Sequence, residues 1–292
     1  MYKAISANKR NTILIMAVFV GIVAAVGWAI STVYGYPSLT PWIIGGAAIY
    51  ALIQYFAASK LAVAMTGAKE IQKRDNVRLW RIVENLSITN GMPMPKVYVM
   101  DDPAPNAFAT GRDPKHAIVA ATTGIMEVMD DRELTAVMAH EMGHVKNYDI
   151  RVSMIAFGLA SAIGVLSDLA FHMMFYGGNG DNRPNNPLVM VLGIVLVILA
   201  PVMAALIQAA ISRQREYLAD ATGALTTRDP EALASALEKL QTYGRPMRKQ
   251  STATAHLFFS NPLKKGFLSN LFSTHPPLES RIERLRSGLT EF

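Results

Sequence analysis

The sequence predicts a mostly helical integral membrane protein, in which four transmembrane helices carry a discontinuous polar domain with a small β-sheet. Half of the 292 residues are apolar and only 17% are charged, whereas charged residues make up about a quarter of an ordinary soluble domain. Four apolar stretches have the length of about 20 residues that a helix needs to cross a bilayer. Two polar segments, the first of which contains short β-like runs, separate and follow these stretches. Together they are long enough to form one domain with its own core.

The first two apolar stretches form the N-terminal part of the chain. No charged residue occurs between Thr12 and Ser59. A basic start also fits a cleaved signal peptide, but the apolar run exceeds the usual 7–15 residues and a second span follows closely, so we expect a retained hairpin. The four predicted spans are residues 12–34, 41–59, 152–176 and 188–211.

Basic residues indicate the orientation of these spans. They gather before the first span, after the second and after the fourth, while the loop between the first two carries no charge. Because basic residues remain on the cytoplasmic side, both termini and both polar segments are predicted to be cytoplasmic. The chain then divides into a transmembrane hairpin, the first part of the polar domain, a second hairpin and the second part of the domain: residues 1–59, 60–151, 152–212 and 213–292.

Charge and cysteine content exclude several classes of protein. The net charge of +6 could indicate nucleic acid, but the basic residues adjoin the spans, where they meet anionic lipid head groups. We therefore expect the lipid bilayer, and no nucleic acid, as a partner. The chain has no cysteine, which excludes disulfides, thiolate metal ligands and thiol catalysis.

Periodicity and turn residues predict the elements of the polar domain. An amphipathic helix ends near Gly91, and three β-like runs follow between turn residues. A helix begins after Asp130, with Glu133 three residues later as in a capping box. Another begins at the Asp229-Pro230 pair. The β-like runs cover residues 96–100, 106–110 and 117–121.

The helix that begins after Asp130 contains the pattern His140-Glu141-Met142-Gly143-His144. Residues i and i+4 share a helix face, so both imidazoles can bind one ion, about 2.0–2.1 Å from zinc. Glu141 lies beside that ion without being a ligand, where it can take a proton from an attacking water and pass it to a leaving amine. Random order gives only about 0.005 such matches in a chain of this composition. The alternative is a pair of surface histidines on an amphipathic helix.

A catalytic zinc site needs a third protein ligand and an open position. Without cysteine, that ligand must be His, Glu or Asp. Glu216 and Asp220 follow the fourth span at i and i+4, so Glu216 can bind the ion while Asp220 orients a histidine. In the alternative, Arg213 and Arg215 neutralise these acids on a solvated face. The predicted hairpin of residues 152–212 favours the first interpretation, because antiparallel spans bring their cytoplasmic ends together.

These motifs resemble those of the HtpX family of bacterial membrane zinc metalloproteases, which are relatives of the CAAX prenyl endoproteases within the gluzincin group. The resemblance covers nearly the whole chain, including the paired N-terminal spans, "NAFATG", the motif helix, "REYLADA" and "THPPLESRI". It implies a zincin-like α+β protease domain at the cytoplasmic face of the bacterial inner membrane, with one Zn²⁺ per chain. It also implies membrane or misfolded proteins as substrates, a role in quality control and the stress response, and membrane protease or chaperone partners.

The resemblance carries over to individual residues of the motifs. It implies that His140, His144 and Glu216 are the metal ligands, that Glu141 is the general base and that Asp220 is the residue that orients a ligand.

Two further residues take a role from the resemblance. The strand that begins at Asn106 is expected near the cleft, where an extended substrate can add beside it by main-chain hydrogen bonds; an ordinary interior strand is the alternative. His275 resembles a histidine that stabilises the tetrahedral oxyanion, and a loop residue is the alternative.

Two other functions stay open. A prenyl-protein endopeptidase belongs to the same group, but four spans cannot build the large intramembrane chamber of those relatives. A non-catalytic zinc scaffold needs only ligands, and its site is usually closed by four of them, so the presence of Glu141 favours an enzyme.

The remaining histidines and one long segment receive no catalytic role. We expect His116 and His256 to be structural. Asp168 and His172 lie at i and i+4 within the third predicted span, where we expect them to pair with each other; a second metal site is the alternative. The basic and aromatic segment 243–273 is not assigned.

Overall fold

The computed structural model describes residues 2–33, 36–156, 158–159, 213–249, 254–262 and 276–288. These residues form two compact units. Residues 10–58 belong to one unit together with the described residues from 155 to 159. Residues 2–9 and 59–154 belong to the other, together with the described residues from 213 onward. Each unit is considered by itself.

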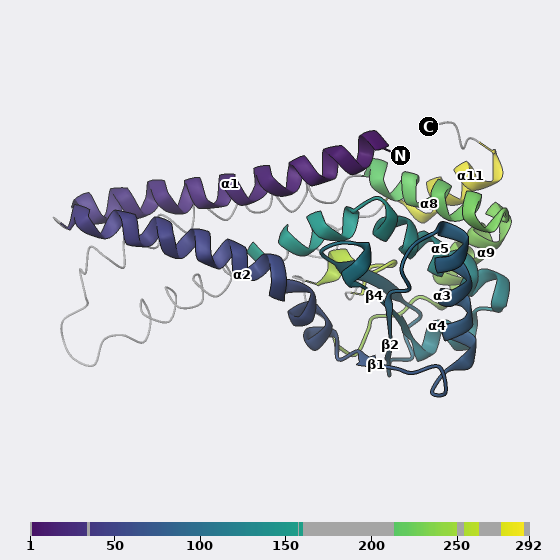
Figure 1. Ribbon diagram of the computed structural model, residues 1–292. Coiled ribbons are helices and arrows are strands. Elements are labelled where there is room, and N and C mark those ends of the chain that lie inside the picture. Colours follow the sequence, from purple (N-terminus) through teal and green to yellow (C-terminus); the bar gives the residue numbers. More distant parts are fainter. Residues whose placement is uncertain are drawn as a thin grey trace, which may run out of the picture. The chain divides into compact units, whose positions relative to one another are not determined.

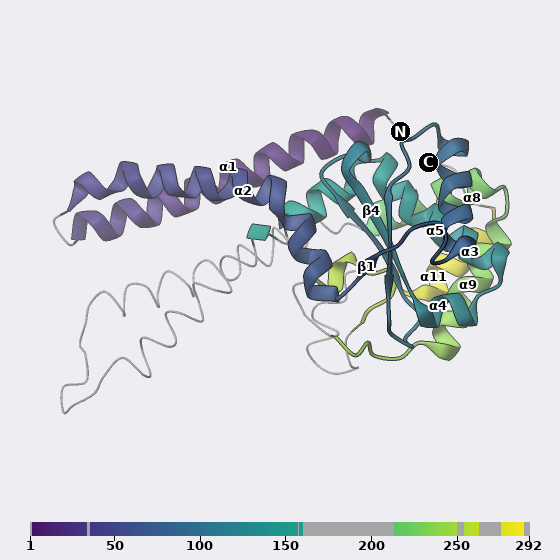
Figure 2. The same ribbon diagram turned by 60° about the horizontal axis from the view of Figure 1, so that its bottom comes forward.

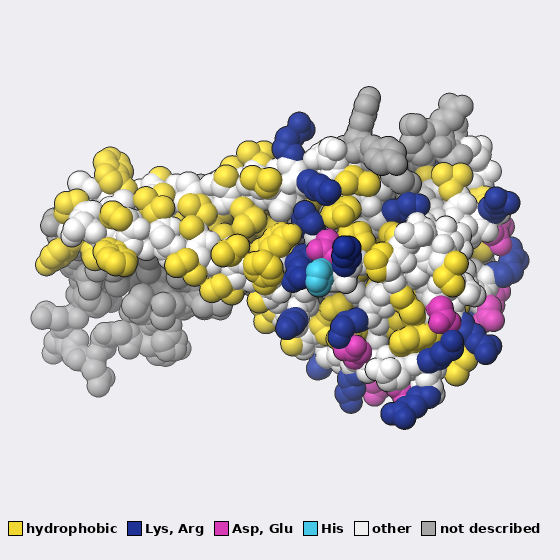
Figure 3. All heavy atoms as spheres, viewed as in Figure 1, with side chains coloured by type: hydrophobic (Ala, Val, Ile, Leu, Met, Phe, Trp, Pro, Cys, Tyr) yellow, Lys and Arg dark blue, Asp and Glu magenta, His cyan; other side chains and the backbone are white. Residues whose placement is uncertain are grey.

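The first unit is built on two long helices, α1 (Tyr2–Val33) and α2 (Thr40–Thr66), joined through the short η1 (Pro37–Leu39). They lie side by side (Figures 1 and 2), with the ring centroids of Phe19 and Tyr50 6.1 Å apart. Both are long and apolar enough to cross a membrane. Apolar side chains cover their exposed surface (Figure 3), as expected of helices that face lipid.

The first two predicted spans are therefore present as long apolar helices, but the helices begin and end at other residues than the predicted spans. The second helix continues seven residues past the predicted end at residue 59, from Lys60 to Thr66. The first begins at Tyr2, so the basic N-terminus is part of the helix. The predicted spans 152–176 and 188–211 lie outside the described residues apart from a helical start at 152–156 and 158–159.

The second unit contains a four-stranded mixed sheet in the order β1-β2-β4-β3. β2 and β4 are parallel, whereas β1 and β3 run antiparallel to their neighbours. The three predicted strands are confirmed, while the two-residue β1 has no sequence signal. β3 lies at an edge of the sheet and is buried along its whole length. The strands are β1 (Lys69–Glu70), β2 (Lys96–Met100), β3 (Ala107–Gly111) and β4 (Ala117–Thr122).

Helices pack together on one side of this sheet (Figure 2). The predicted helix ends are confirmed: α3 ends at Gly91 in the left-handed conformation, and α9 begins after Asp229, whose side chain caps it. The central α5 contacts β3, β4, α3, α8 and α9. The helices are α3 (Val77–Asn90), α4 (Thr123–Val128), α5 (Asp131–Lys146), α8 (Arg213–Thr227), α9 (Pro230–Tyr243) and α11 (Leu278–Arg286), with short 3₁₀ turns η2 (Pro114–His116) and η3 (Ala255–Leu257).

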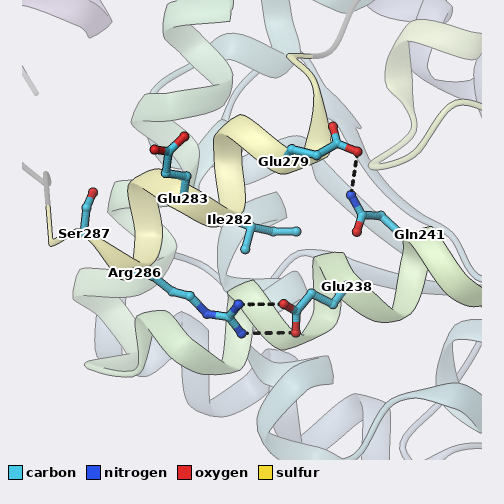
Figure 4. Close-up of a pocket in the computed structure, with 7 residues that line it drawn as sticks. All are labelled: Glu238, Gln241, Glu279, Ile282, Glu283, Arg286 and Ser287. Atoms are coloured by element: carbon cyan, nitrogen blue, oxygen red, sulfur yellow. Dashed lines mark hydrogen bonds and ion pairs between the residues drawn. The ribbon is translucent and has the colours of Figure 1, made fainter.

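A surface hollow of about 530 Å³ lies between α9 and α11 (Figure 4). Four of its polar side chains form contacts between these two helices. Arg286 pairs with Glu231 at 2.7 Å and with Glu238 at 2.6 Å, and Gln241 donates to Glu279 at 2.9 Å. These contacts join the two helices, so we assign the hollow a structural role.

The capping box predicted at the start of α5 is present, and Glu133 extends it into the core. This side chain is only 4% exposed. Its Oε2 accepts from the Asp130 backbone at 2.9 Å and from Lys239 Nζ at 2.6 Å, and its Oε1 accepts from Ser235 at 2.7 Å. Burial opposes ionisation, but Lys239 and Ser235 outweigh it and lower the pKa of Glu133.

We expect Glu133→Gln to lower the free energy of unfolding by about 2 kcal/mol at neutral pH, because the substitution removes the charge from a partly buried ion pair. A lowered pKa contributes stability above the unfolded value of 4.5, and this stability is lost as the pH falls. The difference in thermal unfolding between parent and variant should therefore shrink below about pH 4.5. Glu84→Gln is the matched control, since Glu84 pairs with Lys73 at 3.0 Å on the surface. An equal effect of both substitutions would contradict this role.

Candidate metal centre

The helices α5 and α8 approach closely because glycines face the contact. A Cβ atom added at Gly223 would lie 3.0 Å from the backbone nitrogen of His140, and one added at Gly143 would lie 3.3 Å from Cβ of Thr222. Both separations are shorter than ordinary van der Waals contact, so a side chain at either position would force its neighbours to shift by a few tenths of an ångström. The close approach brings acidic side chains of α8 to the histidines of α5.

Three side chains meet at this contact: His140 and His144 from α5 and Glu216 from α8. The two Nε2 atoms are 3.2 Å apart. Glu216 lies 3.5 Å from Nε2 of His144 and 3.8 Å from Nε2 of His140, measured to its Oε1 and Oε2. Two donors bound at 2.0–2.1 Å to a tetrahedral zinc ion are about 3.3–3.4 Å apart. The two nitrogens are close to this separation, and the carboxylate oxygens lie slightly farther out. One ligand atom from each side chain lies within 4.8 Å of the others, and the nitrogen and oxygen donor set is one that zinc accepts.

Asp220 lies one helical turn after Glu216, on the outer side of His140. Its Oδ1 is 2.9 Å from Nδ1 of His140, so the carboxylate accepts from Nδ1–H and Nε2 can bind a metal. The fully buried Arg281 of α11 donates to both carboxylate oxygens, at 2.7 and 2.9 Å. Burial alone would raise the pKa of Asp220, but Arg281 and His140 hold it well below its usual range. Burial lowers the pKa of His140 to about 4.

His144 has a carboxylate partner of its own. Its Nδ1 lies 3.1 Å from Oδ2 of Asp149. Burial would lower the pKa of His144, but the hydrogen bond to Asp149 and the negative charge of Glu216 raise it to about 9. The carboxylates of Asp149 and Glu216 therefore favour positive charge at His144.

Glu141 is buried beside the cluster, at 2% exposure. It accepts a hydrogen bond from the backbone N–H of Ala109 in β3. Burial, strengthened by the negative charge of Glu216, raises the pKa of Glu141 to about 7. The edge strand thus holds a carboxylate that can bind and release a proton near neutral pH.

Asn106 binds a segment from the far end of the chain. Its side chain donates to the Ser260 carbonyl at 2.8 Å and accepts from the Ser260 N–H at 3.1 Å. Phe259 donates its N–H to the Ala107 carbonyl at 2.8 Å, and its ring packs against His140, with centroids 4.9 Å apart. Part of the β3 edge is thus already paired within the chain.

The fold brings together five of the residues that the sequence singled out: His140, Glu141, His144, Glu216 and Asp220. Of the other candidate site residues and histidines, the structure describes the side chains of Asn106 and His116. Asn106 is 2% exposed and engaged with Ser260. His116 pairs with Asp113 at 2.7 Å in the loop after β3. His275, Asp168 and His172 lie outside the described residues.

Sequence reasoning missed Arg281 and Asp149. Arg281 belongs to the motif "THPPLESRI", but its contact with Asp220 spans 61 positions and has no local signal in the sequence. Asp149 did have one, because an acid five residues after the second histidine of a metal motif is a candidate partner for that histidine.

Comparisons with known proteins agree with this geometry. Residues 73–288 match Peptidase family M48. A "Protease HtpX homolog" of Tropheryma whipplei (strain Twist) is 55% identical over 292 residues, covering the whole of both chains. A "Protease HtpX homolog" of Limosilactobacillus reuteri (strain DSM 20016) is 46% identical, over 98% of this chain and 99% of that protein. The crystal structure of S. mikatae Ste24p shares the fold, with a TM-score of 0.52 and 18% identity over 98% of this chain and 67% of that one.

The family match spans every member of the cluster and implies zinc. Two helices are apolar and long enough to cross a bilayer, in keeping with the full-length HtpX relatives. This chain belongs to peptidase family M48 and is a membrane-bound metalloprotease.

Proposed function

We propose that His140, His144 and Glu216 hold one zinc ion, at which the chain hydrolyses peptide bonds of membrane or misfolded proteins. The observation that carries this assignment is the convergence of three buried or partly buried donors, one from each side chain, whose ligand atoms all lie within 4.8 Å of one another. When bound, zinc polarises the scissile carbonyl and makes the attacking water more acidic.

The side chains around the ion would transfer the proton, orient a ligand and stabilise the oxyanion. Glu141 takes the proton of the attacking water at its carboxylate and delivers it to the leaving nitrogen. The N–H of Ala109 fixes that carboxylate. Asp220 holds the ring of His140 so that Nε2 faces the metal. His275 stabilises the developing oxyanion, a role we carry over from the HtpX resemblance alone.

Substrate binding is proposed along β3. Alternation along an antiparallel strand directs the main-chain groups of Ala107, Ala109 and Gly111 to the outer edge. Ala107 is already paired with Phe259. The N–H of Ala109 is bonded to Glu141, so an extended substrate would pair with the Ala109 carbonyl and with the main-chain groups of Gly111, next to Glu141. Asn106 contributes by fixing Ser260 beside the start of the strand.

We also propose the membrane arrangement: four spans in the bacterial inner membrane, with the termini and the zinc site in the cytoplasm. The support is the distribution of basic residues and the short chain distance from the site to the predicted spans. His144 precedes residue 152 by eight positions, and Glu216 follows residue 211 by five. The five residues before Glu216 span roughly 8 Å as a helix, and the eight residues after His144 include the turn that follows α5. These short stretches of chain would place the zinc near the membrane surface, within reach of membrane-anchored substrates.

Single cysteines test this topology, because the parent chain has none. Arg74 is exposed in the proposed cytoplasmic domain, with 88% of its side chain accessible, and Tyr36 is 63% exposed between the first two helices. We expect a membrane-impermeant maleimide to label Tyr36→Cys in intact cells and Arg74→Cys only in inverted vesicles. The reverse pattern would overturn the orientation.

The substrate class is tested with purified protein in lipid vesicles. We expect cleavage of an unfolded membrane-anchored protein to exceed cleavage of the same unfolded sequence without its anchor. Selective cleavage of a prenylated CAAX peptide would favour the prenyl-protein endopeptidase alternative. Stoichiometric zinc without cleavage of any of the three would indicate a scaffold.

A further inference from the structure

The chain turns sharply directly after the helix that carries both histidines. α5 ends at Lys146, Asn147 and Tyr148 form a turn, and helix resumes at Asp149. Tyr148 has a φ of +63°, in the left-handed region that side chains other than glycine rarely adopt. Such conformations persist where the surroundings hold them, and they concentrate at functional sites.

The turn directs Asp149 back towards the proposed metal site. Its carboxylate is 3% exposed, and Oδ2 reaches Nδ1 of His144 at 3.1 Å. The other ring nitrogen of His144 faces Nε2 of His140 and Glu216. A carboxylate that accepts from Nδ1–H fixes the tautomer and orientation of an imidazole and makes its Nε2 a better metal ligand.

A residue from the first turns of α1 holds both Asp149 and the turn. The buried Asn8 donates from Nδ2 to Oδ1 of Asp149 at 2.7 Å and to the Asn147 carbonyl at 2.8 Å. Its neighbour Lys9 lies over the ring of Tyr148, 4.7 Å from the centroid. The start of α1 thus contacts the turn after α5, although the two segments are 139 to 141 positions apart in the sequence.

We propose that Asp149 is a positioning residue for His144 and that Asn8, at the start of the first predicted membrane helix, acts through Asp149 on the zinc affinity of the site. This inference rests on the proposed function, since it takes His144 as a zinc ligand. Asp149 stands towards His144 as Asp220 stands towards His140, so each histidine is oriented by its own carboxylate. Asp220 accepts from Arg281, whereas Asp149 accepts from the Asn8 amide and also attracts the charge of the partly buried Arg215.

The experiment measures the zinc dissociation constant by chelator competition, on full-length protein in detergent. All variants carry Glu141→Gln, so that self-cleavage does not interfere. We expect Asp149→Asn to weaken zinc binding about 10–100-fold and Asn8→Ala about fivefold, the effect of one net hydrogen bond. The double variant should match Asp149→Asn alone, because Asn8 acts through Asp149.

Asp113→Asn is the matched control. It alters a histidine–aspartate pair of the same kind, with His116 at 2.7 Å, that takes no part in the cluster, and it should leave zinc affinity unchanged. Thermal unfolding with and without zinc separates positioning from general damage. Positioning predicts that Asp149→Asn mainly reduces the stabilisation by zinc, whereas an equal loss with and without zinc would overturn it.

The two levels of inference fail in different ways. If the parent protein binds no zinc, or if His144→Ala leaves its affinity unchanged, the proposed function is wrong. If the parent binds zinc through His144 but Asp149→Asn binds it equally well, only the positioning role is refuted. Additive effects of Asn8→Ala and Asp149→Asn would refute the link through Asn8.

Discussion

Replacing Glu141 by glutamine should abolish proteolysis while leaving zinc bound. Glutamine keeps the shape of the side chain but cannot accept a proton from the attacking water. General acid–base steps contribute about 10²–10⁴-fold to rates, and we expect a loss of kcat/KM in this range. Zinc content should stay at one ion per chain, because Glu141 is not among the three clustered donors.

The measurement pairs cleavage of an unfolded model substrate with metal analysis of the same detergent-purified samples. Glu127→Gln makes the same chemical change on an exposed residue of α4 and should retain the activity of the parent. Parent-like turnover of Glu141→Gln would refute the general-base mechanism. Loss of both zinc and activity would show that Glu141 supports the metal site instead.

Replacing Glu216 by alanine should remove most of the bound metal. Among the described residues, Glu216 supplies the only clustered donor outside α5, so the variant retains two imidazoles, fewer than the three protein ligands of a catalytic zinc site. Changes to residues that only orient a ligand weaken metal binding about 10–100-fold. We therefore expect Glu216→Ala to lower zinc affinity by more than about 100-fold, and Asp220→Asn by less than that.

Chelator competition on both variants measures how much each carboxylate contributes to zinc affinity. Glu238→Ala, which removes a partner of Arg286 on the surface of α9, is the control for loss of a carboxylate and should bind zinc like the parent. Unchanged zinc affinity in Glu216→Ala would mean that the third ligand lies elsewhere. A larger effect of Asp220→Asn than of Glu216→Ala would exchange the roles of these two acids.

The sequence by itself determined the features that depend on residues a few positions apart. His140 and His144 share a helix face because a helix repeats every 3.6 residues, and Asp130 and Glu133 close their capping box within one turn. The apolar lengths of α1 and α2 could likewise be read directly from composition. In each case the interaction is local, so that spacing alone indicates the geometry.

Only the tertiary structure decided which distant groups surround the site. The glycine contact between α5 and α8 brings Glu216 to the histidines, Arg281 reaches Asp220 across 61 positions, and Asn8 reaches Asp149 across 141. Residues 258–260 pair with the start of β3 although nothing in either segment indicates it. Such contacts arise from how whole helices and strands pack, and packing depends on the combined shape of many side chains, which leaves no periodic or spacing signal in the chain.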